Sequence, residues 1–206
     1  MKIGIIGAGH IGGTLAKLWA RSGHDCMVSS RHPDMLSSFV NGNKHLSAGT
    51  VEQASSFGEV VFLAIPLKGI FSIIPKIKNN VNGKTVLDAM NPFIERDGEI
   101  AQEIKRRKMT SGEFTQEHLT DAKIIRAFSS VPYSYLLSES AKEGEKIAIP
   151  YAGNDVHAKE TASLLIENAG FIPFDLGTLE DSKPLDPDGA LFGKALTVRG
   201  VRMLLE

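Results

Sequence analysis

The chain has 206 residues, of which 42% are hydrophobic and 23% charged, and its formal net charge is −1. These values are typical of a globular protein and exclude disorder, collagen and a long coiled coil. The balanced charge gives no support for broad nucleic-acid binding, and no apolar run reaches the roughly 20 residues that a membrane helix requires.

The first half of the chain alternates short apolar runs with helical patterns. An apolar run predicts a strand at 3–6, and after a glycine cluster the apolar spacing predicts a helix over 11–22. A second strand is predicted at 25–29, followed by a helix from 33 to about 40. The continuous apolar run at 60–65 is typical of a strand buried on both faces, as in a parallel sheet.

The same rhythm continues to the end of the chain. Further strands are predicted at 85–88, 123–128, 146–152 and 171–174, and helices at 68–80, 98–108, 113–119, 132–141 and 155–168. The tail has a turn-rich start and then a predicted helix over about 189–205. We therefore expect an α/β fold with a mostly parallel sheet in one domain, 1–178, and a C-terminal helical appendage, 179–206.

A glycine motif directly follows the first strand and begins the first helix. Gly7, Gly9 and Gly12 match the pattern G-x-G-x-x-G. In this position Gly7 permits a tight turn, Gly9 lets the backbone approach a pyrophosphate, and Gly12 allows close packing of helix on strand. The backbone N–H groups around His10 and Ile11 would then meet the anion. The motif predicts a Rossmann-type, doubly wound domain that binds a dinucleotide.

The residues after the second strand indicate which dinucleotide binds. An Asp or Glu there would accept hydrogen bonds from the ribose of NAD, but this sequence has Ser30, Arg31 and His32. Arg31 offers a rigid fork of donors that suits a phosphate, and Ser30 and His32 could add contacts. We therefore predict NADP(H) rather than NAD. The alternative is that Arg31 is a solvated surface residue.

Other candidate residues lie at the carboxyl ends of predicted strands, which face the ligand crevice in an open α/β sheet. These are Ile65 and Pro66 after one strand, Asn91 after the next, and Phe128 after a third. The sequence shows no zinc spacing, no Cys-x-x-Cys and no Gly-x-Ser-x-Gly elbow, so we expect no metal site and no catalytic nucleophile. The single cysteine, Cys26, excludes an intramolecular disulfide, which favours a cytoplasmic protein.

Several motifs in this order resemble the coenzyme F420-dependent NADP oxidoreductases and, more distantly, the cytosolic oxidoreductase domains of membrane ferric reductases. The resemblance covers about residues 1–180. Its motifs are the fingerprint Gly7–Gly12, Ser30-Arg31, Ala64-Ile65-Pro66, Asn91-Pro92, Arg126-Ala127-Phe128 and Ala152-Gly153-Asn154-Asp155. Ser129 departs from the pattern, because the family commonly has Asn there, and the segment 180–185 matches only in part.

The resemblance implies NADP(H) and hydride exchange with a deazaflavin, coenzyme F420, or a similar ring. The nicotinamide would lie near Pro66, Asn91 and Phe128, and the C-terminal segment would close the acceptor pocket. Such a reaction needs no catalytic side chain, because the two rings carry the chemistry and the protein holds them in reach.

Two alternatives remain open. One is an NADPH-dependent reductase of flavin, ferric complexes or a small imine or carbonyl. The other is a non-catalytic NADP(H)-sensing module that signals to a partner protein. We expect a small-molecule hydride acceptor and no nucleic-acid or membrane partner. The apolar tail helix is the one hint of a homodimer.

Overall fold

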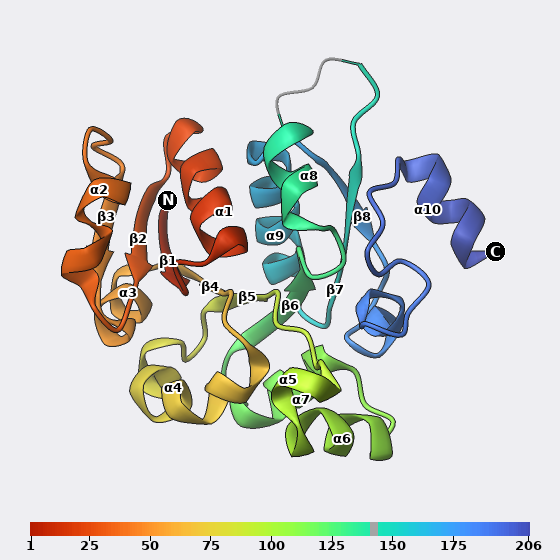
Figure 1. The fold of residues 1–206 in the computed structure, drawn as a ribbon. Helices are drawn as coiled ribbons and strands as arrows, with labels where there is room; N and C mark the ends of the chain where they lie inside the picture. The colour runs from red at the N-terminus through yellow and green to blue at the C-terminus, as the bar shows by residue number, and fades with distance from the viewer. Residues whose placement is uncertain (141–143) are drawn as a thin grey trace.

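The computed structural model describes residues 1–140 and 144–206. They form an eight-stranded sheet of order β3-β2-β1-β4-β5-β6-β7-β8 with helices on both faces (Figure 1). The strands are β1 Lys2–Ile6, β2 Asp25–Ser29, β3 Leu46–Gly49, β4 Val60–Leu63, β5 Thr85–Asp88, β6 Lys123–Ala127, β7 Ala148–Gly153 and β8 Ile172–Asp175. Neighbouring strands are parallel except β6 and β7, so the predicted α/β fold is confirmed.

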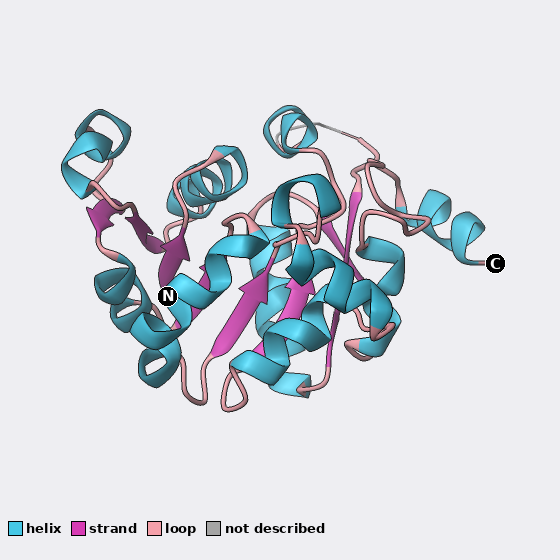
Figure 2. Cartoon of the chain, turned by 60° about the horizontal axis from the view of Figure 1, so that its bottom comes forward, coloured by secondary structure: helices cyan, strands magenta, loops and turns pink. Residues whose placement is uncertain are grey.

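Helices cover both faces of this sheet, which Figure 2 shows from another side. The helices are α1 His10–Arg21, α2 Ser37–Val40, α3 Val51–Phe57, α4 Ile70–Ile77, α5 Ile94–Asp97, α6 Glu99–Arg106, α7 Ser111–His118, α8 Tyr133–Ser138, α9 Val156–Asn168 and α10 Val198–Leu205. Short 3₁₀ turns lie at Pro33–Leu36, Leu67–Gly69, Lys78–Asn80 and Glu180–Leu185. Among the described residues, no helix is long and apolar enough to cross a bilayer.

Each face of the sheet has its own apolar core. On one face, α1, α8 and α9 pack around Trp19, whose ring meets Phe62 and Phe128 edge-on at centroid distances of 5.4 and 5.9 Å. The indole Nε1 of Trp19 donates to the backbone oxygen of Leu165 at 2.8 Å, which ties α1 to α9. On the other face, α4, α6 and α7 supply Ile70, Ile104 and Phe114 to a second core, below the sheet in Figure 1. The sheet is therefore buried on both faces, as its continuous apolar runs predict.

The strand order reverses direction between β1 and β4. After β1 the chain adds β2 and β3 on one side, and after β3 it crosses over to add β4 and β5 on the other. In doubly wound sheets the ligand crevice opens at such a switch point, beyond the carboxyl ends of the two strands. Here these ends are Ile6 and Leu63, which pair in register.

The tail packs against the far end of the sheet. Leu185, Leu191 and Val201 form a small third core with Ala148 of β7. The predicted tail helix over 189–205 is too long, because only Val198–Leu205 is helical. The preceding residues bond to other elements instead of to a helix: the N–H of Gly193 donates to the oxygen of Ser130 at 2.7 Å.

Other differences from the predicted elements are local. The strands predicted at 60–65 and 123–128 end earlier, at Leu63 and Ala127. The helix predicted over 132–141 is observed as Tyr133–Ser138, and residue 141 lies outside the described residues. Strand β3 and helices α3 and α5 were not predicted from the sequence. A capping box between Thr50 and Gln53 begins α3, and it is the signal that could have revealed this helix.

Candidate functional site

The glycine loop after β1 has the geometry that its pattern predicts. Gly7 has φ +115°, and a Cβ there would lie 2.5 Å from the carbonyl oxygen of Ala64. A Cβ at Gly12 would overlap the carbonyl oxygen of Gly7, so helix and loop can meet only through glycine. In contrast, no heavy atom lies within 4 Å of a Cβ built on Gly9. The loop is closed on its inner side and open where Gly9 faces outward.

The N-terminus of α1 is left free for a ligand. Gly9 is the N-cap, no side chain caps the helix, and its first turn holds no acidic residue. The first N–H groups of a helix have no partner within the helix, and the helix dipole makes this end positive. The exposed residues Gly9 and His10 therefore begin a helix that suits an anion, as a pyrophosphate site requires.

The turn after β2 keeps two basic side chains in solvent. Ser30 uses its hydroxyl oxygen to accept a hydrogen bond from the N–H of His32 at 3.0 Å, which holds the turn. Arg31 and His32 are exposed, and no residue of the described chain forms a salt bridge or side-chain hydrogen bond with Arg31. The neighbouring Ser29 is buried and its hydroxyl accepts from the N–H of Gly7 at 3.3 Å. The turn is thus fastened to the glycine loop and leaves Arg31 free.

A pocket of about 360 Å³ opens at the switch point beyond β1, β4 and β5. It is lined by Gly9, His10, Ile11, Ala64, Ile65, Pro66, Ala89, Asn91, Phe93, Arg96 and Tyr133. The structure therefore brings together six residues that the sequence predicted for the site, namely Gly9, His10, Ile11, Ile65, Pro66 and Asn91. They come from three loops that are far apart in the chain.

One wall of this pocket was missed by the sequence analysis. The rings of Tyr133 and His10 are stacked at a centroid distance of 4.4 Å with an interplanar angle of 14°. The guanidinium of Arg96 lies 4.8 Å from the centre of the Phe93 ring. Two aromatic side chains, Phe93 and Tyr133, thus line the same pocket as the predicted dinucleotide residues, and Tyr133 lies directly against one of them, His10. Isolated aromatic residues at the starts of helices carry no sequence motif, so only the fold reveals this wall.

Arg96 is fixed rather than free. It donates to both carboxylate oxygens of Asp97, with the shortest distance 2.8 Å, and to the backbone oxygen of Asn91 at 2.6 Å. Burial alone would raise the pKa of Asp97, but hydrogen bonds from Arg96 and from the N–H groups of Lys68 and Phe93 outweigh burial and lower it. Asp97 is therefore an ionised partner that neutralises Arg96 at the rim of the pocket.

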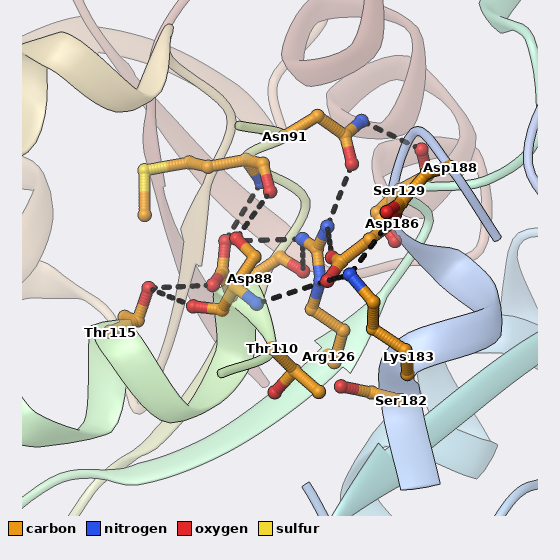
Figure 3. Close-up of polar contacts among 12 residues, drawn as sticks. Asp88, Asn91, Thr110, Thr115, Arg126, Ser129, Ser182, Lys183, Asp186 and Asp188 are labelled. Carbon is orange, nitrogen blue, oxygen red and sulfur yellow. Dashed lines mark hydrogen bonds and ion pairs between the residues drawn. The ribbon is translucent and has the colours of Figure 1, made fainter. Parts of the chain in front are cut away.

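The side-chain amide of Asn91 is held at both its oxygen and its nitrogen. Its Oδ1 accepts from the guanidinium of Arg126 at 2.7 Å, and its Nδ2 donates to the backbone oxygen of Ser129 at 2.8 Å (Figure 3). Arg126 itself is fully buried. Its position within an apolar strand, where an arginine is rare, is the signal that could have marked it.

Behind Asn91 lies a buried cluster that joins two acidic residues to Arg126 (Figure 3). The guanidinium lies 3.5 Å from a carboxylate oxygen of Asp88 and 3.4 Å from one of Asp186. Burial raises the pKa of both Asp88 and Asp186, although Arg126 opposes the shift. One arginine thus serves two buried carboxyl groups, and Lys183 at the surface lies 3.5 Å from Asp186.

Phe128 departs from its expected place near the nicotinamide. Its side chain is fully buried, in edge-on contact with Trp19 and Phe62. The backbone at Phe128 has φ +60°, a left-handed conformation that turns the chain after β6 and sends the ring inward. Phe128 therefore belongs to the core, and its ring lines no part of the pocket.

The C-terminal segment lies beside the pocket rather than over it. No residue of 179–206 lines the 360 Å³ pocket within the described chain, although Phe192 meets Phe93 edge-on at 5.8 Å. Tail residues Lys183, Pro187 and Asp188 instead line a neighbouring pocket of about 210 Å³ together with Pro92–Glu95. The described residues hold no group of three or more His, Cys, Asp or Glu side chains that could bind a metal ion.

The chain is similar to several known proteins. The family model of the coenzyme F420-dependent NADP oxidoreductases matches residues 2–92. The metalloreductase STEAP3 of Rattus norvegicus is 23% identical over 185 residues, which are 90% of this chain and 36% of the relative. The chain thus spans about a third of the length of this curated relative.

Two solved structures share the fold over nearly the whole chain. A hypothetical protein from Sinorhizobium meliloti superposes with a TM-score of 0.77 and 28% identity, covering 96% of this chain and 95% of that one. A candidate F420-dependent NADP reductase from Arthrobacter sp. FB24 gives a TM-score of 0.73 and 22% identity, covering 100% of this chain and 90% of that one. The predicted Rossmann-like α/β fold is thus confirmed, and residues 2–92 match the family model of the coenzyme F420-dependent NADP oxidoreductases.

Proposed function

We propose that the protein transfers a hydride between NADP(H) and a planar acceptor, either the deazaflavin coenzyme F420 or a flavin-like ring. The observation that carries this proposal is the pocket at the switch point. It joins the open side of the glycine loop, at Gly9, to an aromatic wall that contains Phe93 and Tyr133. The pocket thus combines a loop that suits a dinucleotide with aromatic side chains that suit a flat ring.

The dinucleotide half of the proposal uses the predicted residues. The pyrophosphate would meet the N-terminus of α1, where Gly9 leaves room and the N–H groups are free. The 2′-phosphate would meet Arg31, which has a free guanidinium, together with Ser30 and His32. The nicotinamide would lie beside Pro66 and Asn91, where the pocket continues beyond β4 and β5.

The acceptor half is assigned to the aromatic wall. A ring that lies against Phe93 and Tyr133 would share the pocket with a nicotinamide placed beside Ile65 and Pro66. Aromatic side chains favour offset stacking on planar rings. Because Tyr133 is itself stacked on His10, its ring has a fixed orientation, which would limit the tilt of the acceptor ring. These residues would position the two rings, and the bound nicotinamide and acceptor would supply the hydride-transfer chemistry, with a proton from water completing the reduced acceptor.

The experiment is an acceptor panel with purified protein and NADPH. Oxidised coenzyme F420, FMN and a ferric chelate are supplied in parallel, and loss of NADPH and of acceptor colour is followed. The proposal expects reduction of F420 or FMN that depends on NADPH and weakens in Arg31→Ala. A matched control is His157→Ala, because His157 is exposed on α9 and its ring forms a hydrogen bond with Glu160, away from the pocket. NADPH binding without reduction of any acceptor would contradict an oxidoreductase and favour the sensing module.

A ferric reductase is the second candidate. The metalloreductase relative supports it, because the similarity covers 90% of this chain. Reduction of ferric chelate only when FMN is present would favour this alternative, because a flavin can pass on single electrons after it receives the hydride.

The setting and oligomer form the last part of the proposal. A cytoplasmic setting is supported by the single cysteine, which is buried. A homodimer is supported by α10, where Met203, Leu204 and Leu205 are exposed. Light scattering of the wild type and of Met203→Lys tests the dimer, which should dissociate in the variant.

A further inference from the structure

We propose that Arg126 is a positioning residue, which fixes the side-chain amide of Asn91 at the edge of the pocket and is itself held in place by Asp186 of the tail. This inference rests on the proposed NADP(H) site. It adds two residues of no assigned role, one in β6 and one in the tail, to the parts that shape that site. The tail would then affect dinucleotide binding indirectly, by holding the residue that orients Asn91.

The first step is the orientation of the amide. A guanidinium carries only donors, so the group of Asn91 that faces Arg126 must be the oxygen. Oδ1 of Asn91 accepts from Arg126 at 2.7 Å, and Nδ2 donates to the oxygen of Ser129 at 2.8 Å. A reversed amide would set donors against Arg126 and an oxygen against the oxygen of Ser129. One hydrogen of Nδ2 and one lone pair of Oδ1 remain for a ligand.

The second step is that Arg126 cannot move freely. Its side chain is fully buried, and a buried charge is held by its partners because no water replaces them. It donates to the backbone oxygen of Asp88 at 3.1 Å and lies between the carboxyl groups of Asp88 and Asp186 (Figure 3). Asp88 is fixed in turn by the hydroxyl of Thr115 at 2.8 Å and by the N–H of Met90 at 2.8 Å.

The third step connects the tail. Asp186 follows the 3₁₀ turn Glu180–Leu185, is almost fully buried, and accepts from the N–H of Ser111 at 3.3 Å. The same terminal nitrogen of Arg126, NH2, contacts both Asp186 and Asn91. Removing Asp186 therefore frees the nitrogen that orients the amide, and the guanidinium can shift toward Asp88.

The ligand chemistry follows from what Asn91 has left. One donor and one acceptor on a fixed amide match a second carboxamide or a ribose hydroxyl. The carboxamide occurs in the nicotinamide half of NADP(H) and not in its adenosine 2′-phosphate end, which the proposed function places at Arg31 on another loop. We therefore assign Asn91, as oriented by Arg126, to the nicotinamide riboside half of the proposed ligand.

The experiment is a double-mutant cycle with Arg126→Lys and Asn91→Ala. Lysine keeps the positive charge between the carboxyl groups but has one nitrogen, so it cannot reproduce the fork. Binding of NADPH is measured by the fluorescence of its reduced nicotinamide, and adenosine 2′,5′-bisphosphate serves as the probe of the other half. Each single variant should lower the affinity for NADPH by roughly three- to tenfold, which corresponds to about one hydrogen bond. The affinity for the bisphosphate should stay within about twofold of the wild-type value.

The double variant distinguishes an effect of Arg126 through Asn91 from a general effect of Arg126 on the fold. If Arg126 acts through Asn91, the double variant binds NADPH no more weakly than Asn91→Ala alone. The proposal would be overturned if the losses of NADPH affinity in the two single variants add in the double variant, or if the affinity for the bisphosphate falls equally. Asp186→Ala should match Arg126→Lys, and Asp186→Asn, which keeps an oxygen in place, should restore binding. The matched control is Asp188→Ala, because Asp188 also pairs with Lys183 but is exposed and does not contact Arg126.

A second readout needs no cofactor. The side-chain NH₂ signal of Asn91 in the NMR spectrum, identified by its loss in Asn91→Ala, should exchange slowly with water in the wild type. It should exchange faster in Arg126→Lys and in Asp186→Ala, and unchanged exchange in both would refute the positioning role. A wild type that binds neither NADPH nor the bisphosphate would contradict the proposed function, while this signal would still decide the role of Arg126.

Discussion

Substitution of Gly9 by alanine should separate binding from folding at the glycine loop. The structure shows open space around a Cβ at Gly9, with no heavy atom within 4 Å, and the residue has an ordinary φ of −75°. Alanine can therefore adopt the native backbone. The added methyl group occupies the side of the loop that a pyrophosphate must approach, so it should obstruct the ligand and not the fold.

The expected effect on stability is small, because two effects oppose each other. Alanine at an allowed φ restricts the unfolded chain and stabilises by about 0.4–1 kcal/mol. Alanine is also a poorer N-cap than glycine, which costs about the same amount. The net change should stay within about 1 kcal/mol, or about 4 °C in Tm. Gly12→Ala is the contrasting variant, since its Cβ would overlap the oxygen of Gly7 and should cost about 1–3 kcal/mol.

The assay pairs thermal melting with NADPH titration. Gly9→Ala should melt with the wild type but bind NADPH at least about tenfold more weakly, the loss of one charge-assisted hydrogen bond. Gly12→Ala should melt lower, by roughly 2–12 °C. Wild-type NADPH affinity in a folded Gly9→Ala protein would refute the placement of the pyrophosphate over this loop.

Three further predictions concern specificity, pH and the thiol. Arg31→Ala should lower the affinity for NADPH by roughly 10- to 100-fold and leave the affinity for NADH unchanged, because only NADPH carries the 2′-phosphate. Equal losses of affinity in titrations of both cofactors would contradict this role. Burial raises the pKa of Asp186 from 3.8. A carboxyl group whose pKa is raised by folding stabilises at low pH and loses this contribution as pH rises. In urea unfolding, the stability of the wild type relative to Asp186→Asn should therefore fall as the pH rises above about 4, and a constant difference would argue against it. Burial raises the pKa of Cys26 to about 12, so a thiol reagent should modify it only after unfolding, and rapid labelling of the native protein would contradict its burial.

Apolar periodicity and glycine spacing predicted most of the fold, because both patterns depend on local backbone geometry. The strand at 25–29 and the helix at 155–168 match β2 and α9 to within a residue, since apolar runs and cap residues define them. Helix α3 and strand β3 were missed because each is short and only partly apolar. The tail helix was placed too early, because apolar Leu191 and Leu196 pack on β7 from an irregular segment.

The site residues likewise fall into those that local sequence patterns predict and those that only the fold brings together. The glycine loop and the predicted strand ends meet in one pocket because the carboxyl ends of β1, β4 and β5 share an edge. Phe93 and Tyr133 were not predicted, because nothing in the local sequence marks a residue that lines a pocket formed by other segments of the chain. Phe128 was misplaced because its left-handed backbone, and not its position after a strand, decides where the ring goes.

The most direct test of the central claim follows the hydride itself. NADPH labelled with deuterium at the nicotinamide C4 is mixed with the protein and oxidised coenzyme F420, or with FMN, and the reduced acceptor is analysed by mass. The account predicts that deuterium from one face of the nicotinamide appears in the reduced deazaflavin, at a rate that falls in Gly9→Ala. Reduction without label in the deazaflavin, or no reduction of either ring by a protein that binds NADPH, would contradict direct transfer across this pocket.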